Sequence, residues 1–334
     1  MSKKIDNMIK EKEEIVAKEN IRPKTFDKYI GQEKIKEIVK VYIEAAKKRN
    51  EPLEHMLFYG PPGLGKTTIA CIIANEMNKN IHILTGPNLE KPGDIATVLM
   101  SVEEGDIVFI DEIHRINRLV EELLYPAMED FVIDIKVGGN IQSKEKQKII
   151  RLNIPPFTLI GATTRVGMLS APLRDRFGLV NRMEFYNNDE LSQIIQNSAD
   201  ILNVKIDDAS KFEIARRSRG TPRLANRLLK QVRNFAEVRN GGIITNDVVN
   251  DVLKFVGIDD CGLDDNDIKY MMAIYRSGKG KPVGLNTIAS AISEDCGTIE
   301  DVSEPYLLAN GFISKMPRGR CLTDKALNHL NIKL

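Results

Sequence analysis

Residues 60–67 constrain the fold more than any other segment, because they form a complete G-x-x-x-x-G-K-T motif, Gly-Pro-Pro-Gly-Leu-Gly-Lys-Thr. An apolar run at residues 56–59 precedes the motif, and a helix-forming stretch at residues 67–77 follows it. Glycines let such a loop wrap tightly, so that backbone N–H groups point at phosphate oxygens beside the positive N-terminal end of the helix. An ordinary glycine-rich turn needs neither flank. The motif therefore predicts a phosphate-binding P-loop between a strand and a helix.

Two side chains of this loop have predicted chemical roles. Lys66 would neutralise the β- and γ-phosphates of ATP, or the β-phosphate of ADP, and the Thr67 hydroxyl would bind Mg²⁺. A second motif, Ile107-Val-Phe-Ile-Asp111-Glu112, is an apolar strand that ends in two carboxylates. Such a pair often only caps a helix, but downstream of a P-loop it indicates Mg²⁺ support by Asp111 and polarisation of the attacking water by Glu112.

A third strand, Leu159-Ile-Gly-Ala-Thr163-Thr164, ends in hydroxyl groups. In AAA+ ATPases a polar sensor stands at this point, between the two strands just described, and orients the water. We favour Thr164 over Thr163 for this role, although a threonine-rich strand end is the plain alternative. His114 is interpreted as a structural or relay residue and not as a catalytic one.

Arginines follow in the order that AAA+ ATPases require. Arg174 and Arg176 lie just after the sensor strand, where an arginine finger can reach the γ-phosphate bound by a neighbouring subunit. Arg223 opens a later helix and can contact the nucleotide from a lid, which would report loss of the γ-phosphate as a rotation. A single arginine usually forms a surface ion pair, but that reading does not explain the order of all three.

The apolar patterns predict an α/β domain with a parallel sheet, then a small all-helical domain, then a winged-helix domain. The motifs above make the first an AAA+ ATPase domain and the second its lid. Short uncharged runs at residues 56–59, 81–84, 107–110 and 157–160 suit strands that are buried on both faces. From Asn188 the spacing becomes helical, with Thr221 and Pro222 as a helix start and Gly257 as a helix end. We place the domains at residues 1–186, 187–257 and 258–334.

Composition excludes several classes of protein. The 334 residues carry a net charge of +1, so any nucleic-acid contact must come from a local patch. The four cysteines form no C-x-x-C pair, which argues against a structural metal and favours a reducing compartment. The first twenty residues lack the apolar core of a signal peptide, and no apolar run is long enough to span a bilayer. We therefore expect a cytoplasmic protein with no membrane partner.

The motifs taken together resemble the RuvB family of Holliday-junction branch-migration motors, from about Ile21 to the C-terminus. The matching segments include the C-terminal module, which most AAA+ relatives lack. They are residues 21–24, 29–32, 60–67, 111–115, 124–130, 161–165, 172–178, 219–223, 282–285 and 317–320.

The resemblance implies the residues of a nucleotide pocket and of a DNA contact. It favours Arg176 over Arg174 as the finger, with Arg174 in support. For the pocket it implies Ile21, Arg22, Gly63, Gly65, Lys66, Thr67, Thr68, Glu129, Asp130, Phe131, Arg176, Tyr186 and Arg223. For DNA it implies Lys315, Arg318 and Arg320, of which Lys315 replaces the arginine usual in relatives.

The resemblance also implies a function and partners. A homo-hexameric ring would hydrolyse ATP with Mg²⁺ and move double-stranded DNA through Holliday junctions in recombination and repair. A RuvA-type protein would bind the hairpin at residues 132–153, which is longer and more charged than usual, and a RuvC-type resolvase would join the complex. The isoleucines Ile133, Ile135, Ile141 and Ile149 are candidate anchors, unless they pack the hairpin on its own domain.

Two alternatives remain from the motifs alone. A clamp-loader subunit or replication initiator would share the ATPase motifs, but the Pro-Arg-Gly-Arg wing at residues 317–320 and the long hairpin favour the branch-migration motor. A winged-helix regulator with a nucleotide-gated switch would not need both Glu112 and Arg176.

Overall fold

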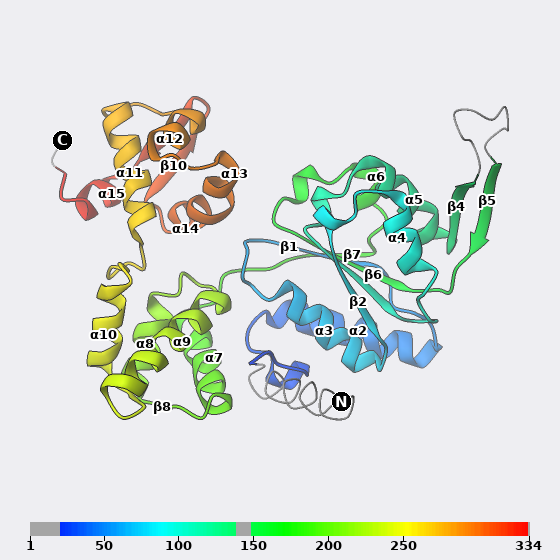
Figure 1. The fold of residues 1–334 in the computed structure, drawn as a ribbon, viewed down its shortest axis with the longest axis horizontal. Helices are drawn as coiled ribbons and strands as arrows, with labels where there is room; N and C mark the ends of the chain where they lie inside the picture. The colour runs from blue at the N-terminus through cyan, green and yellow to red at the C-terminus, as the bar shows by residue number, and fades with distance from the viewer. Residues whose placement is uncertain (1–20, 138–147, 333–334) are drawn as a thin grey trace, which may run out of the picture. The chain divides into compact units, whose positions relative to one another are not determined.

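The structure is a computed structural model that describes residues 21–137 and 148–332 (Figure 1). The hairpin candidate Ile141 lies outside the described residues. Contacts divide the chain into two compact units. The first, here the sheet unit, comprises Arg22–Gly60 and Gly65–Glu184, and the second, here the helical unit, includes Pro61–Leu64 and everything from Phe185 onward. Each unit is described by itself.

The sheet unit is built on a five-stranded sheet in the order β2-β3-β6-β1-β7, and every neighbouring pair is parallel. This confirms the predicted parallel α/β fold. Its strands are β1 (Met56–Tyr59), β2 (Ile81–Thr85), β3 (Ile107–Asp111), β6 (Thr158–Thr163) and β7 (Leu179–Arg182). The apolar pattern does not predict β7, whose Leu-Val-Asn-Arg sequence contains no continuous apolar run.

The prediction that β2 is buried on both faces is wrong. Strand β2 lies at the edge of the sheet, and the side chain of Ile83 is 52% exposed. An apolar run of this length occurs in edge strands as well as in central strands, so the pattern alone does not distinguish them. By contrast, β3 and β6 lie inside the sheet, and their side chains are almost all buried.

Helices cover both faces of this sheet (Figure 1). Helix α2 (Glu33–Arg49) packs against α3 (Lys66–Met77) on one face, and α4 (Pro92–Leu99) and α5 (Arg118–Glu129) pack together on the other, with the short α6 (Ala171–Arg174) beside α5. Helix α2 buries Ile35, Val39 and Ile43, whose spacing of four residues places them on one stripe facing the interior. The short turns are η1 (Phe26–Lys28), η2 (Gly86–Asn88), η3 (Ile113–Arg115) and η4 (Val166–Met168).

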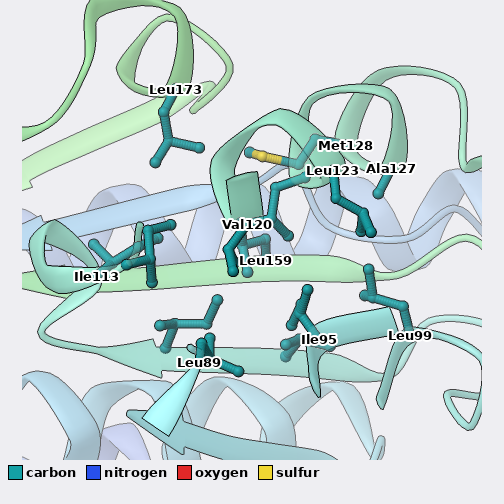
Figure 2. Close-up of a cluster of buried hydrophobic side chains, with 14 of the residues drawn as sticks. Leu89, Ile95, Leu99, Ile113, Val120, Leu123, Ala127, Met128, Leu159 and Leu173 are labelled. Carbon is teal, nitrogen blue, oxygen red and sulfur yellow. The ribbon is translucent and has the colours of Figure 1, made fainter. Parts of the chain in front are cut away.

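One large hydrophobic cluster fixes α4 and α5 on the sheet (Figure 2). Leu159 of β6 meets Ile95 of α4 and Val120 of α5 there, and all three side chains are fully buried. Burying such a side chain contributes about 1.5–3 kcal/mol. The cluster therefore holds the carboxyl ends of β3 and β6, where the catalytic candidates lie, on a closely packed base.

A hairpin extends the sheet unit. Strands β4 (Val132–Val137) and β5 (Lys148–Asn153) pair antiparallel, with Ile133 opposite Leu152 and Ile135 opposite Ile150. Ile133 is fully buried, and Ile135 packs against the core cluster. The base of the hairpin is thereby anchored to its own unit.

The helical unit begins with a small helical lid, as predicted. Its helices are α7 (Asn188–Ile201), α8 (Asp208–Arg216), α9 (Pro222–Arg239) and α10 (Asn246–Phe255), and the two-residue strands β8 (Lys205–Ile206) and β9 (Ile243–Ile244) pair parallel. Thr221 is the N-cap residue of α9, but its hydroxyl donates to the carbonyl of Ser218 and does not cap the helix. Gly257 follows α10 with φ +69°, the left-handed conformation expected after a helix.

The rest of the helical unit is the predicted winged-helix module. Tyr270, Ile288, Leu307 and Phe312 belong to its separate hydrophobic core. Its elements are α11 (Asp265–Gly278), α12 (Leu285–Ile292), α13 (Cys296–Thr298), the π-helix η5 (Ile299–Ser303), α14 (Glu304–Ala309), β10 (Ile313–Met316), β11 (Gly319–Leu322) and α15 (Asp324–His329). Strands β10 and β11 form the hairpin that is the wing.

Candidate active site

The catalytic candidates of the sheet unit converge because the strands that carry them are parallel neighbours. Strand β6 lies between β1 and β3, so Thr163 at its end stands between the P-loop and Asp111. The backbone N–H of Gly60 donates to the carbonyl of Thr163 at 3.1 Å, which joins the start of the P-loop to the sensor strand. Ligands of open α/β sheets bind at this carboxyl edge.

The P-loop has the backbone that phosphate binding requires. Gly63 and Gly65 have φ values of +82° and +98°, which side chains with a Cβ rarely adopt. Lys66 begins α3, and its Nζ, in a side chain that is 8% exposed, donates to the carbonyl of Gly60 at 2.9 Å. Thr67 and Thr68 follow in the first turn, half-buried. The N-terminal end of a helix, with its N–H groups and positive dipole, suits an anion.

Donors suited to Mg²⁺ are also present. The hydroxyl of Thr67 and the carboxylate of Asp111 are hard oxygen ligands, and Asp111 accepts a hydrogen bond from the N–H of Glu112 at 3.0 Å. Among the described residues, no three His, Cys, Asp or Glu side chains form a self-sufficient metal cluster. Magnesium at phosphate sites typically has only one or two protein ligands besides phosphates and water, so this donor set fits it.

Two residues outside the predicted site make contacts at this edge of the sheet, Tyr29 beside the P-loop and Gln32 with Glu184, which follows β7. A Cβ on Gly65 would lie 3.1 Å from the hydroxyl of Tyr29, whose side chain is buried. The amide of Gln32 donates to the carbonyl of Glu184 at 2.7 Å and accepts from its N–H at 3.2 Å. Both belong to the Tyr-Ile-Gly-Gln segment that carries the family resemblance, and that segment was the only signal in the sequence for their role.

Glu112 has a strained backbone, with φ +50°. This conformation is uncommon for a residue other than glycine, and such strain concentrates at functional sites. Its carboxylate is 47% exposed and forms an ion pair with Arg115 at 3.0 Å. The turn thus presents the carboxylate of Glu112 to solvent beyond the end of β3, next to Asp111.

The two threonines at the end of β6 have different surroundings. Thr163 is 1% exposed, its hydroxyl lies 3.0 Å from Nδ1 of His114, and it accepts from the N–H of Arg165 at 2.9 Å. Thr164 is half-buried. The hydroxyl of Thr163 is already hydrogen-bonded to His114 and to the backbone of Arg165. Of the two hydroxyls, that of Thr164 is therefore the better candidate to contact a bound molecule.

The candidate finger Arg176 packs against the end of α5. Its guanidinium lies 3.1 Å from the carboxylate of Glu129, donates to the carbonyl of Pro172 at 2.7 Å and stacks 4.6 Å above the ring of Tyr125. Arg174, the alternative, is 46% exposed, and its Nε lies 4.0 Å from Asp175. The structure thus brings together Arg176 and Glu129, two residues implied for the nucleotide pocket, while Asp130 is exposed and Phe131 is half-buried.

The remaining pocket candidates are Ile21 and Arg22, which precede α2, and Tyr186 and Arg223 of the helical unit. In that unit, the hydroxyl of Tyr186 donates to the carbonyl of Leu64 at 3.2 Å, and the N–H of Arg223 donates to the carbonyl of Gly63 at 3.3 Å. Ile21 is half-buried and Arg22 is exposed. Tyr186 and Arg223 therefore both contact P-loop residues through the backbone of the loop.

The three DNA candidates on the wing have unequal surroundings. Arg318 is exposed at the two-residue tip of the β10–β11 hairpin. Arg320 is only 12% exposed, and its Nε donates to the carboxylate of Glu304 at 2.6 Å while its second amine group contacts Glu300 at 3.1 Å. Lys315 is 51% exposed and lies 3.1 Å from Glu304.

Glu304 organises the wing as the centre of this network. Its side chain is 2% exposed and also accepts from the hydroxyl of Tyr270 at 2.8 Å. Burial acts to raise the pKa of Glu304, but hydrogen bonds from Arg320, Tyr270 and Lys315 outweigh it and hold the pKa below its ordinary value. Gly319, with φ +141°, lets the start of β11 pack closely against the backbone of Val283. A Cβ at this position would lie 2.2 Å from the carbonyl oxygen of Val283.

The comparisons with known proteins cover the same three regions. Residues 21–183 match the model of the Holliday junction DNA helicase RuvB P-loop domain, residues 186–259 that of the RuvB AAA lid domain, and residues 260–331 that of the RuvB C-terminal winged helix domain. Among the described residues, the longest helices are too short or too polar to cross a membrane.

Solved structures agree with the family models. The Thermotoga maritima RuvB Holliday junction branch migration motor is 47% identical with a TM-score of 0.85. Two single-residue mutants of T. maritima RuvB are 48% identical, with TM-scores of 0.87 and 0.86. Each alignment covers 94% of this chain and 99% of the other. This chain therefore belongs to the RuvB family of Holliday junction branch migration motors, and its P-loop domain is that of a nucleotide-binding ATPase.

Proposed function

We propose that this protein is an ATP-driven motor that forms a homo-hexameric ring and moves double-stranded DNA through Holliday junctions. A RuvA-type junction-binding protein and a RuvC-type resolvase would act in the same complex. The observation that supports this most is the coexistence, in one chain of the RuvB family, of a P-loop domain that carries the hydrolytic candidates and a winged-helix module with a positive wing tip. We propose the division into domains at residues 1–186, 187–257 and 258–334 for the same chain.

In the hydrolytic step, each residue acts from the position described above. Lys66 and the first-turn N–H groups of α3 bind the phosphates, and Thr67 with Asp111 would hold Mg²⁺, which supplies charge neutralisation at the phosphates when bound. Glu112 orients and polarises the attacking water, and Thr164 holds the same water by its hydroxyl. Thr163, with His114, supports the strand end on which Thr164 lies.

A ring arrangement explains why Arg176 and Glu129 lie together on one surface. A finger acts on the γ-phosphate bound by a neighbouring subunit. Arg176, with Glu129 and the residues at 130–131, would then form the surface that a subunit offers to its neighbour's nucleotide. Tyr186 and Arg223 would act on the nucleotide bound by their own chain, since both contact the backbone of its P-loop.

On the DNA side, we assign phosphate contact to Arg318 and Lys315 and a supporting role to Arg320. Arg318 is exposed at the tip of the wing, whereas Arg320 is committed to Glu304 and Glu300. The tip residues Pro317 and Arg318 include no aromatic side chain that could stack on bases. Contact with phosphates alone carries no sequence information, and a motor that moves along DNA needs this property.

Replacing Arg318 with Ala is expected to weaken DNA binding equally on unrelated duplex sequences. One lost phosphate contact lowers the slope of log affinity against log salt concentration by about 0.9. Titrating fluorescent duplexes at several salt concentrations measures this slope. In contrast, Arg320→Ala leaves Glu304 buried without its main partner, so thermal or urea unfolding should show a loss of about 3 kcal/mol in the free energy of unfolding. An Arg318→Ala variant with the wild-type slope would contradict the assignment.

ATP hydrolysis in the presence of a four-way junction and a RuvA-type protein tests the proposed function directly. The rate should rise above the rate of the protein alone. Ile149, on β5, is 65% exposed, so it is available to a partner, whereas Ile133 and Ile135 pack on their own unit. Replacing Ile149 with Asp should remove the partner-dependent rise and spare the rate without partner, since apolar anchors typically contribute 2 kcal/mol or more, about thirtyfold, to such interfaces.

The matched control is Ile243→Asp, which places the same charge on an isoleucine of β9 that is 48% exposed. This variant should respond to the partner like the wild type. Full stimulation of Ile149→Asp would exclude Ile149 as an anchor. If the wild-type rate of ATP hydrolysis does not change with the junction and the partner but rises with DNA alone, a different DNA-handling AAA+ machine would be favoured instead.

A further inference from the structure

Arginines at the end of α8 connect the lid to the winged-helix module. Arg217, which is 7% exposed, forms ion pairs with Glu213 of its own helix and with Asp260 beyond the lid. Arg219, two residues later, is 12% exposed, and among the described residues its guanidinium forms polar contacts with Gly262, Asp264 and Asp267, all beyond the lid. Arg219 is therefore a residue of the lid whose charged group is buried in the neighbouring module.

The guanidinium of Arg219 is held from several directions. Its Nε donates to the carbonyl of Gly262 at 2.6 Å, and one amine group lies 2.9 Å from Asp264 and 2.6 Å from Asp267. The ring of Tyr306 lies 5.4 Å away, in a cation–π contact. We call Arg219, Asp264, Asp267 and Tyr306 the latch.

The backbone around Arg219 is hydrogen-bonded toward Tyr186 and the P-loop residue Gly63. Arg219 has φ +51° and leads into Gly220, whose carbonyl accepts from the N–H of Tyr186 at 2.9 Å. Arg223, four residues later, donates its N–H to the carbonyl of Gly63 in the P-loop. Within the helical unit, one short segment thus contacts P-loop residues through its backbone and the winged-helix module through the side chain of Arg219.

The ion pairs of the latch fix the orientation of Arg219 more than they stabilise the fold. Asp267 is 1% exposed, and its burial raises its pKa to about 6 against the attraction of Arg219, with Asp264 adding repulsion. A buried ion pair of this kind gains little over apolar packing, but it requires one geometry. Only arginine offers a planar group that can reach two carboxylates, a carbonyl and a ring face together.

We propose that Arg219 is a positioning residue that makes the lid and the winged-helix module move as one body, so that changes at the P-loop reach the wing. This proposal rests on the proposed function, because it explains how nucleotide state and DNA movement are coupled. A loss of the latch should free the wing from the lid without altering the wing's own contacts, which are held by Glu304.

The first test measures this rigidity without DNA or turnover. Spin labels at Val238, which is 85% exposed on α9, and at Met316 of β10, in a chain whose four cysteines are replaced by serine, report the distance between lid and wing. The wild type should show one narrow distribution that is the same with ADP and with a non-hydrolysable ATP analogue. Arg219→Met should broaden it. Arg233→Met removes an arginine whose ion pair with Glu237 lies within α9, so it should match the wild type.

The second test measures coupling. Tyr306→Leu removes the ring beside Arg219 from the winged-helix side and should leave ATP hydrolysis without DNA unchanged. Its stimulation by duplex DNA should fall by at least about fivefold, the lower end of typical couplings between sites. Arg219→Lys should recover less than half of the stimulation that Arg219→Met loses, because an ammonium group cannot make the same contacts. Tyr306→Leu and Asp267→Asn keep the test valid if Arg219→Met does not fold.

The outcomes separate the latch from the proposed function. A narrow distance distribution in Arg219→Met, or full DNA stimulation in Tyr306→Leu, would overturn the latch. A wild type whose hydrolysis ignores DNA would count against the proposed function, while the distance distributions would still decide whether Arg219 fixes the lid to the wing.

Discussion

Replacing Glu112 with Gln is expected to leave ATP bound and to slow its hydrolysis by about 10²–10⁴, the usual contribution of a general base. In the proposed mechanism Glu112 acts on the attacking water, whereas Lys66 neutralises the charge of the phosphates in the ground state. Lys66→Ala should therefore lose nucleotide binding itself. Binding of a fluorescent ATP analogue and steady-state phosphate release measure the two effects separately.

The control for Glu112→Gln is Glu122→Gln, which also removes a carboxylate from a partly exposed arginine pair, here with Arg118 on α5. It should hydrolyse ATP like the wild type. Wild-type turnover in Glu112→Gln would show that the strained turn after β3 does not carry the base, and that the acidic pair at residues 111–112 only supports the loop.

Arg176→Ala is expected to keep ATP bound and to lower turnover by about 10³–10⁵, the range for an arginine finger. Arg176 contacts Glu129 and Tyr125 of its own chain, which would hold the proposed finger in place before a neighbouring subunit binds. In the proposed ring the finger acts in trans, so adding the variant to wild-type rings should inhibit neighbouring sites as well. Turnover measured at graded mixing ratios should therefore fall faster than the wild-type fraction.

Arg174→Ala is the matched control, since Arg174 lies on the same short segment but makes only a 4.0 Å contact with Asp175. It should reduce turnover far less than Arg176→Ala. A strictly proportional loss of turnover in mixtures of Arg176→Ala with wild type would place the action of Arg176 within its own subunit. A larger loss in Arg174→Ala would exchange the two roles.

Much of the hydrolytic site could be predicted because its motifs are local and end strands. A P-loop needs glycines and a lysine within eight residues, and Asp111 and Thr163 each follow an apolar run. In a parallel sheet all such ends meet at one edge, so placing the motifs on strands also predicts their meeting. The order β3-β6-β1 confirms that the sensor strand lies between the other two.

Two features are harder to predict from the sequence: which strand lies at the edge of the sheet, and which distant residues make contacts near the P-loop. Whether an apolar run such as residues 81–85 is central or at an edge depends on which strands pair, and pairing is decided by the whole domain. Tyr29 packs beside Gly65, about 35 residues away in the sequence. Gln32 forms hydrogen bonds with the backbone of Glu184, about 150 residues away. Nothing in the spacing of a single sequence shows such contacts.

The sequence by itself determined the fold class, the family and the residue types of the candidate hydrolytic site, because these depend on local motifs and on periodicity. Only the tertiary structure decided how residues of the same type divide their roles. The hydroxyl of Thr163 is hydrogen-bonded to His114. Arg320 is paired with Glu304, and Arg219 is paired with Asp267. Each division follows from burial beside a distant partner, since a buried polar group must be satisfied by whichever group the fold places next to it.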